Sequence, residues 1–243
     1  MINYRYFKYR HINKYSIDSL VKGNLFFAAP EKLNDPFDCR LDIRKSIQNA
    51  ASKVSDEKAS LLYNFLKIEE LLKRLQAAIS QIGICSFSLD PKNVLMWSHY
   101  ADAHKGMSIL YDFPEKYLND GEKFIGISDV SYEQDSLTNW FMELSGSLPI
   151  KSTDYDIAIE LTKKLMTIKS PDWEYEKEVR IIRPKPGVLK INKEYISQIC
   201  FGLHTTDCDI ELIREIVSQY NHKVNLCKVV RTKQDFGIEL VEI

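Results

Sequence analysis

The sequence predicts an α+β fold in which one curved, mixed β-sheet is flanked by helices. Short apolar or alternating segments, typical of strands, are interspersed with segments whose apolar residues recur at helical spacing. The two kinds of segment follow no regular repeat, which favours an α+β arrangement. Of the 243 residues, 44% are hydrophobic, enough for one sizeable core, so we expect residues 1–243 to form a single domain.

Local signals place the elements in order along the chain. Residues 4–9 alternate aromatic and basic side chains and predict a strand, and a short helix over 17–22 should end at Gly23. Periodicity and turn residues predict the rest. In order, they are a strand over 25–29, one long or two broken helices over 55–82, strands over 84–87, 107–111 and 130–132, helices near Trp140 and over 155–168, strands over 176–183 and 199–201, a helix over 209–220, and closing strands over 226–230 and 237–241.

A dense aromatic and polar segment lies between the strands 84–87 and 107–111. Asp90 and Pro91 are typical of a helix start and Gly106 of a helix end, so we expect a helix of about four turns. His99 and Asp102 are three positions apart and would interact on that helix. The segment is either a buried helix with polar tips or one wall of a site.

Composition limits the classes of function. A formal net charge of −1 argues against a protein whose main task is wrapping nucleic acid, although a local basic groove remains open. The five cysteines are odd in number and contain no C-x-x-C pair, which favours neither a disulfide framework nor a zinc site. We expect a cytoplasmic protein without a membrane span and without a metal.

The late strand carries the sharpest chemical pattern. Alternation puts Val179 and Ile181 on one face, and Glu176, Glu178 and Arg180 on the other. The charged face is either a solvated sheet surface or the lining of a cleft. In a cleft, neighbouring carboxylates repel each other, which prepares one of them for acid-base or cation-stabilising work.

Two earlier segments offer similar choices. Lys8 or Arg10 on the first strand would contact phosphate and Tyr9 would stack on a base or nicotinamide ring, unless this strand is an edge of the sheet with basic side chains. Asn34-Asp-Pro-Phe-Asp38 forms a proline turn that is either structural or, through the carboxylates of Asp35 and Asp38, a clamp for a ribose hydroxyl, a guanidinium or a metal.

Four segments together resemble the domain-of-unknown-function family 2971. They run from residue 8 to about residue 203 in the order of the family. They are Lys8-Tyr-Arg10, Asn34-Asp-Pro-Phe-Asp38, Met96-Trp-Ser-His-Tyr-Ala-Asp102 with His104-Lys-Gly106, and Trp173-Glu-Tyr-Glu-Lys-Glu-Val-Arg180. The resemblance implies a bacterial, cytoplasmic setting and a role such as phage defence.

The layout is also similar to the ADP-ribosyltransferase superfamily: an early strand with a basic or aromatic residue, a short helix, a strand with small residues, and a late strand with a glutamate. This similarity implies NAD as substrate and a nucleic-acid or protein acceptor. It assigns catalysis to Glu178, Glu176 and Tyr100, with the choice between the two glutamates left open. The implied cofactor-binding residues are Lys8, Tyr9, Arg10, Asn34, Asp35, Trp97, His99 and Arg180.

Two other classes of function stay open. One is a non-catalytic module that binds a nucleotide or nucleic acid through Lys8, Arg10, Trp97 and Tyr100. The other is a metal-dependent nuclease that holds magnesium through Asp35, Asp38, Glu176 and Glu178. The chain has no G-x-S-x-G elbow, Walker-type loop or G-x-G-x-x-G fingerprint, which counts against hydrolase, P-loop and Rossmann proteins.

Overall fold

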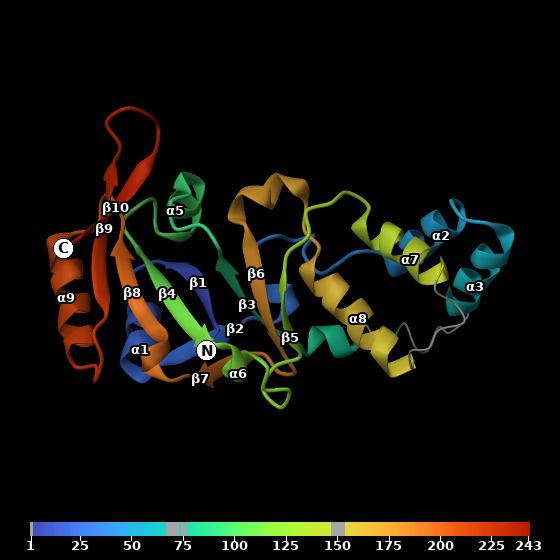
Figure 1. Cartoon of the computed structure of the whole chain (residues 1–243), viewed down its shortest axis with the longest axis horizontal. Coiled ribbons are helices and arrows are strands. Elements are labelled where there is room, and N and C mark those ends of the chain that lie inside the picture. The colour runs from blue at the N-terminus through green and yellow to red at the C-terminus, as the bar shows by residue number, and fades with distance from the viewer. Residues whose placement is uncertain (1, 67–72, 74–76, 147–153) are drawn as a thin grey trace.

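A large mixed β-sheet flanked by helices organises the protein, as Figure 1 shows for the computed structural model, which describes residues 2–66, 73, 77–146 and 154–243. Eight strands form this sheet in the order β10-β9-β8-β4-β1-β3-β6-β5, and β2 and β7 form a separate two-stranded sheet. Only the β8–β9 pair is parallel among the described pairs. The predicted α+β class with a mixed sheet is therefore confirmed.

The strands have the following bounds: β1 Asn3–Arg10, β2 Asn24–Phe27, β3 Gly83–Ser88, β4 Met107–Pro114, β5 Gly126–Asp129, β6 Glu178–Arg183, β7 Gly187–Lys190, β8 Ile196–Phe201, β9 Asn225–Arg231 and β10 Ile238–Glu242. The helices are α1 Lys14–Lys22, α2 Ile43–Ala51, α3 Asp56–Leu66, α5 Val94–Tyr100, α6 Glu115–Leu118, α7 Ser136–Gly146, α8 Asp154–Thr167 and α9 Asp207–Ser218, with short 3-10 helices η1 Pro30–Lys32, η2 Pro171–Glu176 and η3 Lys193–Tyr195.

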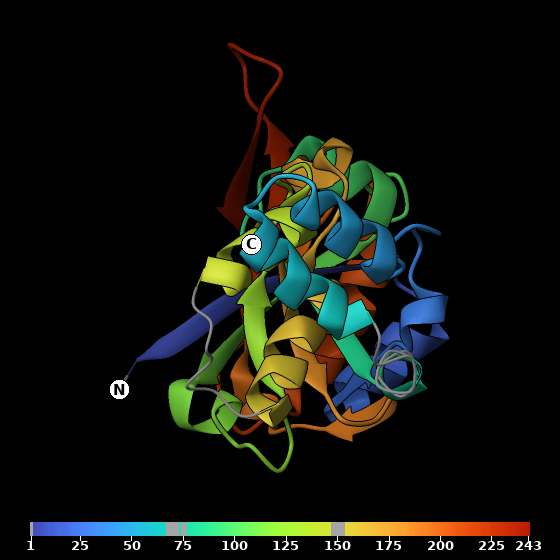
Figure 2. The ribbon, with the colours of Figure 1, turned by 90° about the vertical axis from the view of Figure 1, so that its right-hand side faces the viewer.

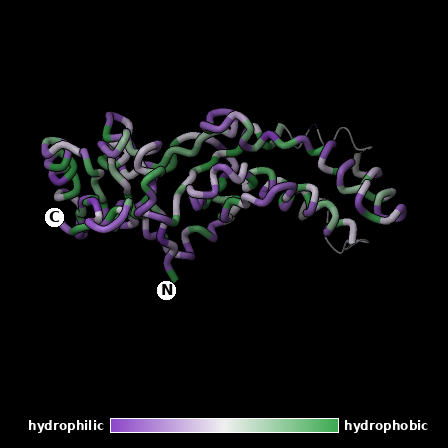
Figure 3. The backbone as a smooth tube through the Cα atoms, turned by 90° about the horizontal axis from the view of Figure 1, so that it is seen from above, coloured by the Kyte–Doolittle hydropathy of each residue, from purple (hydrophilic) through white to green (hydrophobic). Residues whose placement is uncertain are grey.

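The molecule is elongated, with helices α2, α3 and α7 at one end and helix α9 at the other (Figure 1). Figure 2 looks along the molecule from the end with α2 and α3, and Figure 3 shows the same elongated outline from above. One apolar core joins the central strands to α1 and α9, through residues such as Phe113, Leu20 and Ile213. A second core gathers α2, α7 and α8 beside Ile84 and Ile182.

Strand β1 lies inside the sheet, because it pairs with β3 on one side and with β4 on the other, and its rings pack on both faces. Tyr6 packs in the first core, and the Tyr9 ring meets Trp97 edge-on at 5.2 Å. The interpretation of this segment as a sheet edge is therefore wrong. Of its basic side chains, Arg5 is exposed to solvent, whereas Lys8 lines the cavity described below.

The predicted four-turn helix after β3 is wrong. Helix α5 has seven residues and is capped by Asn93, whose side chain accepts hydrogen bonds from the backbone N–H groups of Leu95 and Met96. The chain then makes a left-handed turn at Asp102, Ala103 and His104, with φ angles of 50°, 49° and 68°. Asp102 lies 3.8 Å from His11 rather than beside His99.

Packing against the chain near β8 explains this early end. The backbone N–H of His204 donates to the carbonyl of His104 at 2.9 Å, and Gly106 donates to Ala101 at 2.7 Å. A Cβ atom at Gly202 would lie 2.1 Å from the carbonyl oxygen of His104. The turn is thus held partly by the long-range contacts of His104, which helical periodicity does not encode.

Other expectations need smaller corrections. The strand expected over 130–132 is β5 at 126–129, although Ser131 still forms an isolated bridge. The strand expected from Glu176 begins at Glu178, because Lys177 adopts a left-handed φ of 44°. Helix α2 and strand β7 were not predicted. The question of one or two helices over 55–82 falls partly outside the described residues.

Candidate functional site

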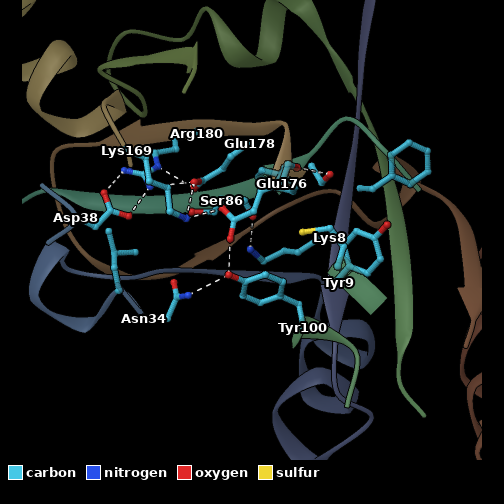
Figure 4. A pocket seen from close by; sticks show the side chains of 15 residues that line it. Lys8, Tyr9, Asn34, Asp38, Ser86, Tyr100, Lys169, Glu176, Glu178 and Arg180 are labelled. Atoms are coloured by element: carbon cyan, nitrogen blue, oxygen red, sulfur yellow. Dashed lines mark hydrogen bonds and ion pairs between the residues drawn. The ribbon is translucent and has the colours of Figure 1, made fainter. Parts of the chain in front are cut away.

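A cavity of about 120 Å³ opens where β1, β3 and β6 lie side by side. Figure 4 shows that its side chains come from all four motifs singled out in the sequence. Its charged residues are Lys8, Asp38, Lys169, Glu176, Glu178 and Arg180. The charged face of the late strand therefore lines a cavity, and its interpretation as a solvated sheet surface is wrong.

Arg180 anchors the floor of this cavity with every N–H group of its guanidinium. Nη1 and Nη2 donate to Asp38 at 2.8 and 2.6 Å, and Nε and Nη2 donate to Glu178 at 2.8 and 2.9 Å. Nη1 also donates to the carbonyl of Met166 at 2.7 Å. Since an arginine offers five donors in a rigid fork, this side chain is fully used and holds three elements together.

Glu178 is held in its ionised form by this arrangement. Burial opposes the charge, but Arg180 and Lys169 outweigh burial and lower the pKa of Glu178 to about 2. Lys169 lies 3.3 Å from one Glu178 oxygen. Burial also opposes the charge of Lys169, yet Glu178 and Glu176 together raise its pKa.

Glu176 lies in a different environment, at the end of η2. Burial raises its pKa, and contacts with Lys169 at 2.5 Å and with the Tyr100 hydroxyl only partly offset that rise. Two hydrogen bonds fix η2 in place: Ser88 donates to the carbonyl of Glu176 at 2.7 Å and Asn93 to that of Tyr175 at 2.8 Å. The two glutamates thus differ in protonation tendency although both line the cavity.

Tyr100 connects Glu176 to the turn that follows β2. Asn34 donates from Nδ2 to the Tyr100 hydroxyl at 2.9 Å, and that hydroxyl donates to Oε1 of Glu176. Burial and the neighbouring carboxylate raise the pKa of Tyr100, so the hydroxyl remains protonated and able to donate. A directional chain of hydrogen bonds therefore ends on Glu176.

Lys8 closes the cavity on the β1 side. Its Nζ donates to the carbonyl of Ser86 at 2.6 Å and lies 5.0 Å from the centre of the Phe87 ring. Burial lowers the pKa of Lys8. Formally, three carboxylates face three cations, so loss of the Lys8 proton would leave the cavity with one excess negative charge.

A second hollow of about 530 Å³ adjoins the cavity and shares Tyr9 and Tyr100 with it. Arg10, His11 and His99 line this larger groove. Of the residues expected from sequence, Lys8, Asn34, Tyr100, Glu176, Glu178 and Arg180 meet in the cavity itself, Tyr9 lines both hollows, and Arg10 and His99 line the groove.

Two of the expected site residues lie elsewhere. Trp97 is fully buried in the core, where Nε1 donates to the carbonyl of Pro91 at 2.9 Å. Asp35 is buried and accepts from the backbone of Phe37 at 2.9 Å, as turn-forming aspartates do. The Tyr9 hydroxyl is also occupied, because it donates to the carbonyl of Asp90 at 2.6 Å.

Sequence reasoning missed Lys169 and Ser86 as cavity residues. Lys169 follows the α8 helix and is separated from the late motif by Ser170, Pro171 and Asp172. Its only signal is a lone basic residue before a Ser-Pro turn, a pattern too common on protein surfaces to single it out. Its burial between two glutamates appears only in three dimensions.

Neither a metal site nor a membrane span emerges from the residues that the structure covers. Among the described residues, no group of three or more His, Cys, Asp or Glu side chains is arranged to hold a metal ion. Asp38 and Glu178 direct their oxygens at Arg180 instead. Within the same ranges, no helix is long and apolar enough to cross a membrane.

Fold and site together define an α+β protein with a small cavity lined by six charged side chains, of which all but Lys8 are buried. Residues 96–181 match the family described as "Protein of unknown function (DUF2971)". The predicted resemblance to this family is thereby confirmed over that segment, which holds Tyr100, Glu176, Glu178 and Arg180. No curated protein and no solved structure matches the chain.

Proposed function

We propose that the protein breaks the N-glycosidic bond of NAD and transfers ADP-ribose to a macromolecular acceptor. The observation that carries this proposal is that Lys8 on β1, Tyr100 and Glu178 on β6 line one cavity, with Glu176 beside them. Likeness to the ADP-ribosyltransferase superfamily calls for an early basic strand and a late glutamate strand beside a common pocket. Here β1 pairs with β3, and β3 pairs with β6.

The two hollows suit the two halves of a dinucleotide. The cavity of about 120 Å³ suits a planar ring and part of a ribose, with Tyr100 in its lining. The groove of about 530 Å³ suits the larger ADP half, and Arg10 in its lining is a suitable partner for pyrophosphate oxygens. Tyr9 and Tyr100 line both hollows, and in this proposal one ligand occupies the two together.

The two glutamates suit two roles, because different environments prepare two carboxylates for different tasks. Glu178, with its lowered pKa, supplies a fixed negative charge near the ribose when positive charge develops there. Glu176, with its raised pKa, is the better proton acceptor. Lys169 contacts both and is a positioning residue in this scheme.

In the proposed step, the bond between the anomeric carbon and the nicotinamide nitrogen breaks, and nicotinamide leaves as a neutral molecule with the bonding electrons. A hydroxyl or amine of the acceptor forms the new bond to the anomeric carbon and gives its proton to Glu176. The positive charge of the nicotinamide ring in NAD is thereby removed, so charge and protons balance. Water in place of the acceptor would give free ADP-ribose.

The test is release of nicotinamide from NAD by the purified protein, alone and with cellular RNA, DNA and lysate protein added. Glu176→Gln should lower the rate by roughly 100-fold or more, the usual contribution of a general base. Glu174→Gln is the matched control, because Glu174 lies on the same 3-10 helix but is exposed. It should release nicotinamide at the wild-type rate.

Glu178→Gln should also lose activity, but with a lowered unfolding temperature, since it breaks the Arg180 cluster. A wild-type protein that releases no nicotinamide with any acceptor fraction would refute the proposal. So would equal rates for wild type and Glu176→Gln.

A further inference from the structure

A third hollow, away from the charged cavity, has the composition of a nucleic-acid site. It measures about 660 Å³ and lies among the C-terminal end of α1, strand β7, helix η3 and the segment after α9. Figure 1 shows α1, β7 and α9 at the same end of the molecule. Three lysines, two rings and four carboxamides line it, with Glu194 as the one acidic member of its lining.

The lysines give this groove a positive charge that the whole chain lacks. Lys22, Lys190 and Lys193 line the hollow, whereas the chain carries a formal net charge of −1. Lys22 forms an ion pair with Asp18 at 2.5 Å, and Glu194 accepts a hydrogen bond from Asn192 at 2.8 Å. The remaining field still favours anions, because two lysines stay without an ion pair among the described residues.

The rings in the groove are fixed in place. The Tyr220 hydroxyl donates to the carbonyl of Leu20 at 2.6 Å, and a ring nitrogen of His222 lies 2.9 Å from the carbonyl of Ile196. Their centroids are 5.4 Å apart, and Lys193 lies 4.9 Å from the centre of the Tyr220 ring. Aromatic rings held beside lysines form a platform on which a base can stack while its phosphate is neutralised.

The carboxamides complete the pattern, because an amide side chain both donates and accepts hydrogen bonds at a base edge. Asn24, Asn192, Gln219 and Asn221 line the hollow. A duplex hides its stacked faces, so a hollow that combines phosphate-binding lysines with rings suits exposed bases. An acidic peptide would use the lysines but would leave the rings and amides without matching partners.

We infer that this lysine groove binds single-stranded nucleic acid. Asn24 lines both this hollow and the groove beside the charged cavity. A strand bound there would therefore lie near the proposed NAD site. The inference does not depend on NAD turnover, because it rests on the lining of a separate hollow.

The test measures how tightly the full chain binds a fluorescently labelled single-stranded oligonucleotide. Fluorescence anisotropy gives the affinity at each of a series of salt concentrations. For single strands, log K falls with log salt by about 0.7 per neutralised phosphate. Lys190→Gln and Lys193→Gln should each weaken binding and reduce the slope by about that amount. Lys53→Gln, at an exposed lysine in the turn after α2, should leave the affinity and the salt slope unchanged.

His222→Ala tests the ring contribution, and it should weaken binding without changing the salt slope. Unfolding curves of each variant check that the fold is intact. Equal binding of a duplex of the same sequence would overturn the single-strand inference. Absence of binding by wild type, or equal slopes for wild type, Lys190→Gln and Lys193→Gln, would overturn the site itself.

Discussion

Arg180 and Asp38 form a two-point ion pair although 142 positions separate them in the chain, with N–O distances of 2.8 and 2.6 Å. Both side chains are only 1% exposed. The pair ties the turn after β2 to strand β6, and Arg180 extends it to Glu178 and to the carbonyl of Met166. One guanidinium thereby fixes the positions of the groups at the base of the cavity.

Removal of that guanidinium should be strongly destabilising. Arg180→Gln leaves the carboxylates of Asp38 and Glu178 buried without their partner, and breaking such a pair from one side costs about 3–5 kcal/mol. Urea unfolding measures the change. Arg214→Gln is the control: its pair with Glu211 is exposed, so it should change stability by less than about 1 kcal/mol. Similar losses for both variants would contradict a structural role for the cluster.

Acid should weaken the protein partly through Glu178. Its pKa falls from the usual 4.5 to about 2 on folding, so its stabilisation is present above about 4.5 and is lost as the pH falls toward 2. A shift of this size is on the order of 3 kcal/mol. Glu178→Gln should therefore flatten the dependence of unfolding free energy on pH between about 2 and 4.5.

Glu176 should change the pH dependence of the unfolding free energy in the opposite direction, so it serves as the comparison for Glu178. Its pKa is raised in the folded state, so the folded protein holds this proton more tightly and loses stability as the pH rises above 4.5. Glu176→Gln should remove that decline while it leaves the acid-side slope in place. If the unfolding free energy of Glu176→Gln and Glu178→Gln depended on pH in the same way, the two glutamates would not have opposite pKa shifts.

Much of the fold could be predicted because its strands and longer helices are locally encoded. β3 and β4 carry apolar runs, and α9 shows helical spacing that the structure reproduces to within two residues. The turn at Asp102–His104 could not be predicted, because the contacts of His104 and Gly202 that hold it join residues distant in sequence.

Most residues of the candidate site could be identified from the sequence, but their arrangement in space could not. Alternation identified Glu178 and Arg180 as sharing a face, since strand periodicity is local. It placed Glu176 on the same strand, whereas a left-handed Lys177 separates them. Lys169 gave no usable signal, because its significance lies in its two carboxylate partners.

Tyr100 should set the pH at which Glu176 works. The Tyr100 hydroxyl stabilises the ionised form of Glu176, so Tyr100→Phe should raise the pKa of Glu176 further. A hydrogen bond to a charged group contributes about 1.5–3 kcal/mol, or about one pH unit or more. The acid limb of the kcat/KM profile for nicotinamide release should therefore move to higher pH.

The matched control is Tyr175→Phe, which removes a nearby tyrosine hydroxyl that forms no hydrogen bond to Glu176 among the described residues. Its acid limb should stay at the wild-type pH. An unmoved limb in Tyr100→Phe, with a changed rate alone, would show that Tyr100 acts on the substrate rather than through Glu176.

The left-handed turn after α5 should respond to glycine in opposite ways at two neighbouring alanines. Ala103 is exposed and has a φ of 49°, a region that costs an L-residue about 1–2 kcal/mol and costs glycine nothing. Ala103→Gly should therefore stabilise the protein by about 0.5–1 kcal/mol after the entropy of glycine in the unfolded chain is deducted. Ala101 has a φ of −118° and is fully buried, so Ala101→Gly should destabilise it. Urea unfolding of the two variants gives the comparison, and a loss of stability in both would mean that the backbone at Ala103 is not strained in solution.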